Sequence, residues 1–277
     1  MSHPINWEPL ITNFRATWGR AYVRIFAATR EPSWLIGEVL FPVLGMFAYV
    51  YVYRALGARR EYESFVVIGG VMMAYWVAVL WSMGAQFHWE KQGGQLELYL
   101  VAPCSRMAIL TGMAIGGLVM TTIRALASGL IGLFIFRVPF HPANPLALLA
   151  VFLLTLCCLY ALGMCLASLF LLYGREVWQL SHALQEPVFL ASGMYFPLKA
   201  LGPWAVAGVS ALPLALGLDA MRQLLFPPDV AQGMLPLRTE ILALAVSLVG
   251  FLWLATALLS WMECAAKKNG TLIMRHQ

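Results

Sequence analysis

The amino-acid sequence predicts an all-α integral membrane protein, because apolar residues dominate its composition and charges are scarce inside its long apolar runs. Of its 277 residues, 61% are hydrophobic and 11% are charged, and the mean hydropathy is +0.76. Soluble domains average roughly half apolar and a quarter charged residues. We therefore predict a bundle of six transmembrane helices, preceded by an amphipathic helix and interrupted by one polar loop and one broken apolar segment.

The basic excess fits a membrane topology better than a nucleic-acid partner. Net charge is +5 and the isoelectric point is about 9.0, but the lysines and arginines lie mainly in loops and at the chain ends. Such residues commonly set the orientation of membrane proteins. Three of the five cysteines lie inside one apolar run, so we expect neither a disulfide framework nor a metal site. No cleavable signal peptide is recognisable, and no nucleic-acid binding is expected.

Residues 5–30 predict an amphipathic helix. Apolar residues recur at steps of three and four, and Asn13, Arg20 and Arg24 share the opposite face. We expect this segment, within an N-terminal unit of residues 1–32, to lie at the membrane interface with its basic face toward lipid headgroups. The alternative is a soluble helix packed on a partner protein. Glu31-Pro32 ends the helix in either case.

Six apolar runs are each close to the roughly 20 residues that cross a bilayer. They form a predicted transmembrane domain over residues 33–262, followed by a tail over residues 263–277. The predicted spans are residues 34–53, 65–87, 107–136, 146–173, 177–197 and 241–262.

Residues 200–218 carry no charge but are broken by Gly202, Pro203, Gly208, Pro213 and Gly217. We predict two short half-helices that enter the membrane and return, a re-entrant hairpin over about residues 200–222. The alternative is a complete seventh span. With six spans and an inner N-terminus, ten lysines and arginines lie inside and seven outside. This bias favours six spans with both termini cytoplasmic.

The polar stretch HWEKQGGQLELYLVAPCSRM, residues 88–107, separates two apolar runs. Its apolar residues fall at helical spacing, and a Gly93-Gly94 pair precedes them. The spacing leaves two alternatives open, a short helix on the membrane surface or an ordinary loop that ends before Pro103.

This stretch resembles the cytoplasmic loop of the type-2 ABC exporter permeases, in which an acidic and a basic residue precede Gly-Thr-Leu-Glu, several apolar residues and proline. The sequence departs from that pattern at Gln95 and Lys91. The resemblance implies a coupling helix at about residues 90–104 that sits in a groove of a separate ATPase. The coupling residues implied are Glu90, Lys91, Gly94, Leu96, Glu97, Leu100 and Pro103.

A second stretch also resembles this family. Residues 187–197, PVFLASGMYFP, and residues 218–222, LDAMR, are similar to the end of the fifth span and a re-entrant helical hairpin at the outer mouth of those permeases. The residues implied at this outer gate are Ser192, Gly193, Phe196, Pro197, Pro213, Asp219 and Arg222.

No catalytic constellation or phosphate-binding loop is present in the sequence, so we do not expect this chain to bind ATP by such a loop. The resemblance implies a transport subunit and not an enzyme. The resemblance implies that no cofactor binds this chain, that ATP and Mg²⁺ bind two partner ATPase subunits, and that a second copy or a sister permease completes a dimer among membrane lipids. It further implies an exporter in the inner membrane of a prokaryote. The predicted cargo is an amphipathic or lipid-like molecule or a drug. The alternatives are a lipid-linked polysaccharide, a secondary transporter and a membrane-embedded enzyme.

Two charged residues, Arg124 and Glu186, fall near the middles of the predicted third and fifth spans. Charge at this depth is costly, so we predict that they pair. Such a pair either fixes helix packing, which we favour, or belongs to the translocation path. Glu38 lies near a span end and receives no predicted role.

Overall fold

The computed structural model describes residues 8–30, 32–86, 90, 93–137, 144–173, 177–198, 208, 212–231 and 233–269. These residues are almost entirely helical, and they contain no strand. The prediction of an all-α protein is confirmed.

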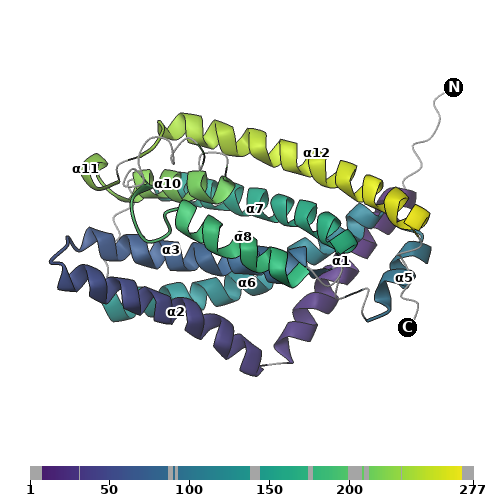
Figure 1. The fold of residues 1–277 in the computed structure, drawn as a ribbon, viewed down its shortest axis with the longest axis horizontal. Helices are drawn as coiled ribbons and strands as arrows, with labels where there is room; N and C mark the ends of the chain where they lie inside the picture. Colours follow the sequence, from purple (N-terminus) through teal and green to yellow (C-terminus); the bar gives the residue numbers. More distant parts are fainter. Residues whose placement is uncertain are drawn as a thin grey trace.

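Long helices run side by side and form the body of the molecule (Figure 1). Helix α1 is inclined across one end of this bundle, where the short α5 also lies, whereas α10 and α11 lie at the opposite end. The helices are α1 (Glu8–Thr29), α2 (Pro32–Ala55), α3 (Glu61–Val77), the π-helix η1 (Ala78–Gly84), α5 (Gln95–Val101), α6 (Arg106–Phe136), α7 (Pro145–Tyr173), α8 (Val177–Ala191), α10 (Pro213–Leu225), α11 (Pro228–Ala231) and α12 (Leu237–Asn269).

Among the residues that the structure describes, five helical segments are long and apolar enough to cross a membrane. They are Ile36–Ala55, Glu61–Gly84, Arg106–Phe136, Pro145–Phe170 and Leu237–Met262. They correspond to the predicted first, second, third, fourth and sixth spans, which makes the chain a multi-pass membrane protein. The last helix continues to Asn269, so part of the predicted tail is helical. No proline or glycine interrupts residues 251–269, which explains the extension.

The predicted fifth span is different. Helix α8 has only 15 residues and ends at Ala191, short of the predicted Pro197 and of the roughly 20 residues that a crossing helix needs. Gly193 adopts φ +58°, a left-handed conformation that ends helices. Its amide donates to the Leu190 carbonyl at 3.2 Å. The residues around this turn, Ser192–Tyr195, are buried.

The second span changes its helical type partway along. After Val77, the chain forms seven residues of π-helix, and the Ala85 amide donates five residues back to the Leu80 carbonyl at 3.2 Å. π-helices are rare and often mark functional sites. The sequence carries no periodicity signal that would predict this segment.

Helices α1 and α6 approach each other closely because α6 presents glycines to α1. A Cβ atom on Gly112 would lie 2.4 Å from the Thr17 carbonyl oxygen, and one on Gly116 would lie 2.9 Å from that of Ala21. Two α1 side chains complete the contact. The Asn13 Oδ1 accepts from the Ser105 amide at 2.7 Å, and the Thr17 hydroxyl donates to the Ala108 carbonyl at 3.0 Å. The start of α6 is thereby fixed to α1.

Candidate functional site

The predicted coupling stretch forms a short helix at the α1 end of the bundle. Helix α5 begins after Gly94, whose φ of +71° is readily accessible only to glycine, and a Cβ there would meet open space. The side chains of Leu98, Val101 and Pro103 are exposed. A surface helix is therefore formed, shorter than residues 90–104. The predicted coupling residues Leu96, Glu97 and Leu100 belong to α5, but their side chains, like all of Lys91, lie outside the described residues.

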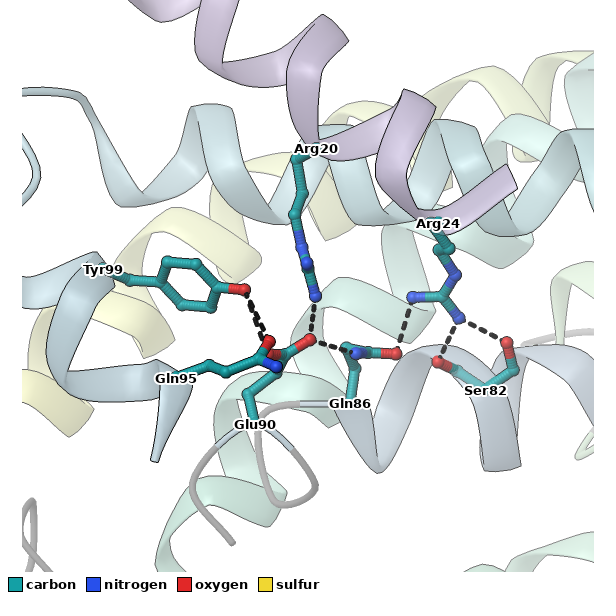
Figure 2. Close-up of polar contacts among 7 residues, drawn as sticks. All are labelled: Arg20, Arg24, Ser82, Gln86, Glu90, Gln95 and Tyr99. Atoms are coloured by element: carbon teal, nitrogen blue, oxygen red, sulfur yellow. Dashed lines mark hydrogen bonds and ion pairs between the residues drawn. The ribbon is translucent and has the colours of Figure 1, made fainter. Parts of the chain in front are cut away.

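Glu90 lies inside the protein and not on the exposed face of α5. Its side chain is only 6% exposed, and Arg20 of α1 forms an ion pair with its Oε1 (Figure 2). The Gln86 amide donates to the same oxygen at 2.6 Å, and the Tyr99 hydroxyl of α5 donates to Oε2 at 3.0 Å. The structure therefore places the predicted coupling residue Glu90 behind α5 and not on its exposed face. The carboxylate ties α5 to α1.

The same network continues to the π-helix. Arg24, one turn beyond Arg20 on α1, donates to Gln86 Oε1 at 2.7 Å, to the Ser82 carbonyl at 2.5 Å and to the Ser82 hydroxyl (Figure 2). Gln86 therefore bridges Glu90 and Arg24. A continuous set of polar contacts leads from Tyr99 of α5 to Ser82 of η1. We call these residues the α5–η1 network: Arg20, Arg24, Ser82, Gln86, Glu90 and Tyr99.

Burial shapes the charges of this network. It lowers the pKa of Arg20, and it lowers the pKa of Arg24 to about 10, an effect that the nearby charges of Arg20 and Arg124 reinforce. Both guanidinium groups remain protonated at neutral pH. Burial also raises the pKa of the Tyr99 hydroxyl, which stays a hydrogen-bond donor. The Arg20 guanidinium lies 5.3 Å from the centre of the Tyr99 ring, a favourable cation–π distance.

This arrangement reverses the predicted orientation of α1. Arg20 and Arg24 point into the protein, and the exposed face of α1 is apolar, with Phe14 72% and Trp18 63% exposed. The prediction that its basic face meets lipid headgroups is wrong. Amphipathic spacing identifies two faces of a helix, but it does not show which one packs on the protein when the neighbouring helix supplies a buried carboxylate.

A second polar region lies at the opposite end of the bundle, near α10. The fully buried Arg222 donates to the carbonyls of Gly193 at 2.7 Å, Met194 at 2.9 Å and Phe196 at 3.3 Å. Its guanidinium also lies 4.4 Å from the centre of the Phe65 ring. Arg222 therefore holds the turn that follows α8. Of the predicted gate residues, Ser192, Gly193, Phe196 and Pro197 lie in this turn, and Pro213 and Asp219 lie in α10 with Arg222.

Asp219 forms a buried acid pair that the sequence did not predict. The other member of the pair, Glu240 of α12, is buried as well. The Gln223 amide donates to both, at 3.2 Å to Asp219 and at 3.0 Å to Glu240. The Asp219 Oδ2 also accepts from the Met234 amide at 2.6 Å. Glu240 precedes the predicted sixth span by one residue, which explains why its burial escaped prediction.

The predicted partner of Arg124 is incorrect. Arg124 forms an ion pair with Glu38 of α2, and the two side chains are 12% and 31% exposed. Both border a cavity of about 130 Å³ that Trp81 and Ser82 of η1 also line. The predicted partner Glu186 is exposed and accepts from the Gln185 amide at 3.3 Å. The position of Glu38 near a span end predicts that it reaches water, but the structure pairs it with Arg124 of α6.

No group of three or more metal-ligating side chains occurs among the residues that the structure describes. The short exposed helix α5 is instead joined to α1 through the buried Glu90, and further hydrogen bonds lead to η1. The sequence profile of the ABC-2 type transporter family matches residues 12–226, most of the chain. The chain belongs to the ABC-2 type transporter family. Comparison with curated proteins finds none that matches this permease significantly.

Membership of this family makes the chain a transport subunit and not an enzyme, and it implies an ATPase partner subunit. Within this permease, both regions that resembled the family form polar clusters at opposite ends of the bundle. Sequence reasoning missed Arg20, Arg24, Ser82 and Gln86 as members of one network. The available signal was the pair of arginines one turn apart on a single face of α1.

Proposed function

We propose that this permease is the membrane subunit of an ATP-driven exporter and that its ATPase subunit binds at α5. The α5–η1 network is the observation that supports this assignment. An exposed helix of seven residues could move independently of the bundle, but Tyr99 and Glu90 attach it to α1. Force applied to α5 would therefore reach buried helices.

The proposed mechanism is alternating access without chemistry in this chain. ATP-driven closure of the partner shifts α5, and the shift passes from Tyr99 to Glu90 and Gln86. Arg24 then carries it to the carbonyl of Ser82 in η1. A π-helix holds one more residue per hydrogen-bonded ring than an α-helix, and a change of register in η1 is the proposed response to this shift. Trp81 of η1 donates to Gln185 of α8 at 2.7 Å, which extends the path to α8.

At the opposite end, the turn held by Arg222 and the start of α10 would gate release, as part of a re-entrant hairpin over about residues 200–222. We propose that α8 and the turn after it complete a sixth crossing. Both termini are then cytoplasmic, α1 lies at the membrane interface, and α10 lies at the outer mouth. The proposed location is the inner membrane of a prokaryote.

The proposed complex contains two ATPase subunits, which bind ATP and Mg²⁺, beneath two permease chains, either two copies of this one or a copy with a sister permease. The apolar spans suit an amphipathic or lipid-like cargo or a drug. Export of a lipid-linked polysaccharide is the second candidate. The observation that favours it is the cavity beside Arg124 and Glu38, since a polar cargo group needs a polar partner within the membrane.

Affinity purification of the tagged permease from mild detergent tests the proposal. Wild type is compared with Gly94→Trp and Glu97→Arg, with identification of partners by mass and an ATP hydrolysis assay. Gly57→Trp is the matched control, because Gly57 also has positive φ, +65°, and open space at its Cβ position, but lies at the other end of the bundle. We expect a co-purifying ATPase that both α5 variants lose and the control retains. Absence of an ATPase with wild type would refute the proposal and favour a secondary transporter or a membrane-embedded enzyme.

A further inference from the structure

An apolar groove lies between α3, α6 and α7, and α10 also contributes to its lining. Its volume is about 490 Å³, and every residue that lines it is apolar. The lining includes Val71 of α3, Leu133 of α6, Phe152 of α7 and Leu225 of α10. The groove therefore offers no hydrogen-bond partner to a polar ligand, and its natural occupant is a hydrocarbon chain.

The groove opens sideways, between helices that are long and apolar enough to cross a membrane. Leu126, Leu130 and Leu149 on its rim are 57%, 50% and 56% exposed. It extends along α6 from Leu126 to Leu133, about 10 Å at 1.5 Å per residue. The hydrocarbon core of a bilayer is about 30 Å thick, so one leaflet contributes about 15 Å. The groove covers roughly two-thirds of that leaflet thickness. It suits one acyl chain, but it is too short a contact for a neighbouring spanning helix.

A positive charge stands at one end of the groove. Arg137 caps α6 one turn beyond Leu133, and its amide donates to the Leu133 carbonyl at 3.0 Å. Its side chain is exposed and forms no ion pair with any carboxylate in the described part of the chain. We propose that this is an anionic phospholipid site, with one acyl chain in the groove and the phosphate beside Arg137. The site does not depend on an ATPase partner.

Photo-crosslinking in lipid nanodiscs tests this site. A benzophenone amino acid replaces Leu130, and nanodiscs contain equal amounts of phosphatidylglycerol and phosphatidylcholine. We expect adducts with phosphatidylglycerol, detected by intact mass. Leu149→Trp and Leu126→Trp, which fill the groove from its rim, should each lower the yield at least fivefold. Arg137→Gln should lower the preference for phosphatidylglycerol about fivefold, equivalent to about 1 kcal/mol for one basic residue at a membrane surface.

Matched controls lie on α12, outside the groove. Leu242→Trp adds the same bulk at a residue that is 65% exposed, and Arg238→Gln removes an exposed arginine near the start of α12. Both should leave the adduct yield and the lipid preference unchanged. Equal labelling by the two lipids, or yields that the groove-filling variants do not lower, would overturn the proposal. Adducts between two permease chains would overturn it in favour of a second copy on this face.

Discussion

Replacing Glu90 with glutamine should destabilise the permease more than any other single change in the α5–η1 network. The substitution keeps the size of the side chain but removes the charge that pairs with Arg20. Breaking a buried ion pair costs about 3–5 kcal/mol, because the remaining charge is left uncompensated. Arg20 keeps 15% of its side chain exposed, so partial hydration of the guanidinium favours the lower end, about 3 kcal/mol.

A double-mutant cycle with Arg20→Gln measures the interaction directly. Thermal unfolding in detergent should show a midpoint about 6–12 °C lower for Glu90→Gln, at roughly 2–4 °C per kcal/mol for a large domain. The double variant should lose less stability than the sum of the single variants. The difference should be about 1.5–3 kcal/mol, the range for a hydrogen bond to a charged group.

Glu63→Gln is the matched control, since Glu63 pairs at 2.7 Å with Arg54, whose side chain is 43% exposed. Water replaces the lost partner there, and we expect a change below about 1 kcal/mol. In the assembled transporter, Glu90→Gln should uncouple ATP hydrolysis from transport, whereas Glu63→Gln should not. Additive single variants, or an equal loss in the control, would refute the reasoning that Glu90 joins α5 to α1.

Three further predictions concern packing and buried charge. Gly112→Val should lower the free energy of unfolding by about 1–3 kcal/mol, because its Cβ would lie 2.4 Å from the Thr17 carbonyl oxygen and force α1 away from α6. Gly250→Val is the control, since a Cβ there meets open space, and it should leave the unfolding midpoint unchanged. Glu240→Ala should cost about 1–3 kcal/mol, because the Gln223 and Leu235 amides lose their acceptor, whereas Glu240→Gln keeps an acceptor oxygen and should unfold closer to wild type. Equal midpoints for both variants would contradict this role of Glu240 as acceptor. Glu38→Leu alone should lose roughly 3 kcal/mol and regain most of it when combined with Arg124→Met. Transport by that double variant would assign the pair a packing role, and its loss would assign the pair to the path.

Much of the fold follows from composition and spacing. Five of the predicted spans coincide with long apolar helices, because about 20 apolar residues in a bilayer have few alternatives to a helix. The structure also forms a short helix at α5 and brings Gly193 and Arg222 together, within the two stretches that resemble the family. The contact that holds the turn after α8 was not predictable, since Arg222, which binds the carbonyls of Gly193 and Met194, lies about 29 residues further along the chain.

The sequence by itself determined the membrane class, the family, and the positions of most helices. These depend on local properties, namely hydropathy, helical spacing and short motifs. Only the tertiary structure decided which charges meet. Arg20 and Arg24 turn inward to Glu90 and Ser82, and Arg124 pairs with Glu38. Partner choice depends on which helices pack together, because a buried charge pairs with the nearest carboxylate in space, and distance along the chain does not reveal which one that is.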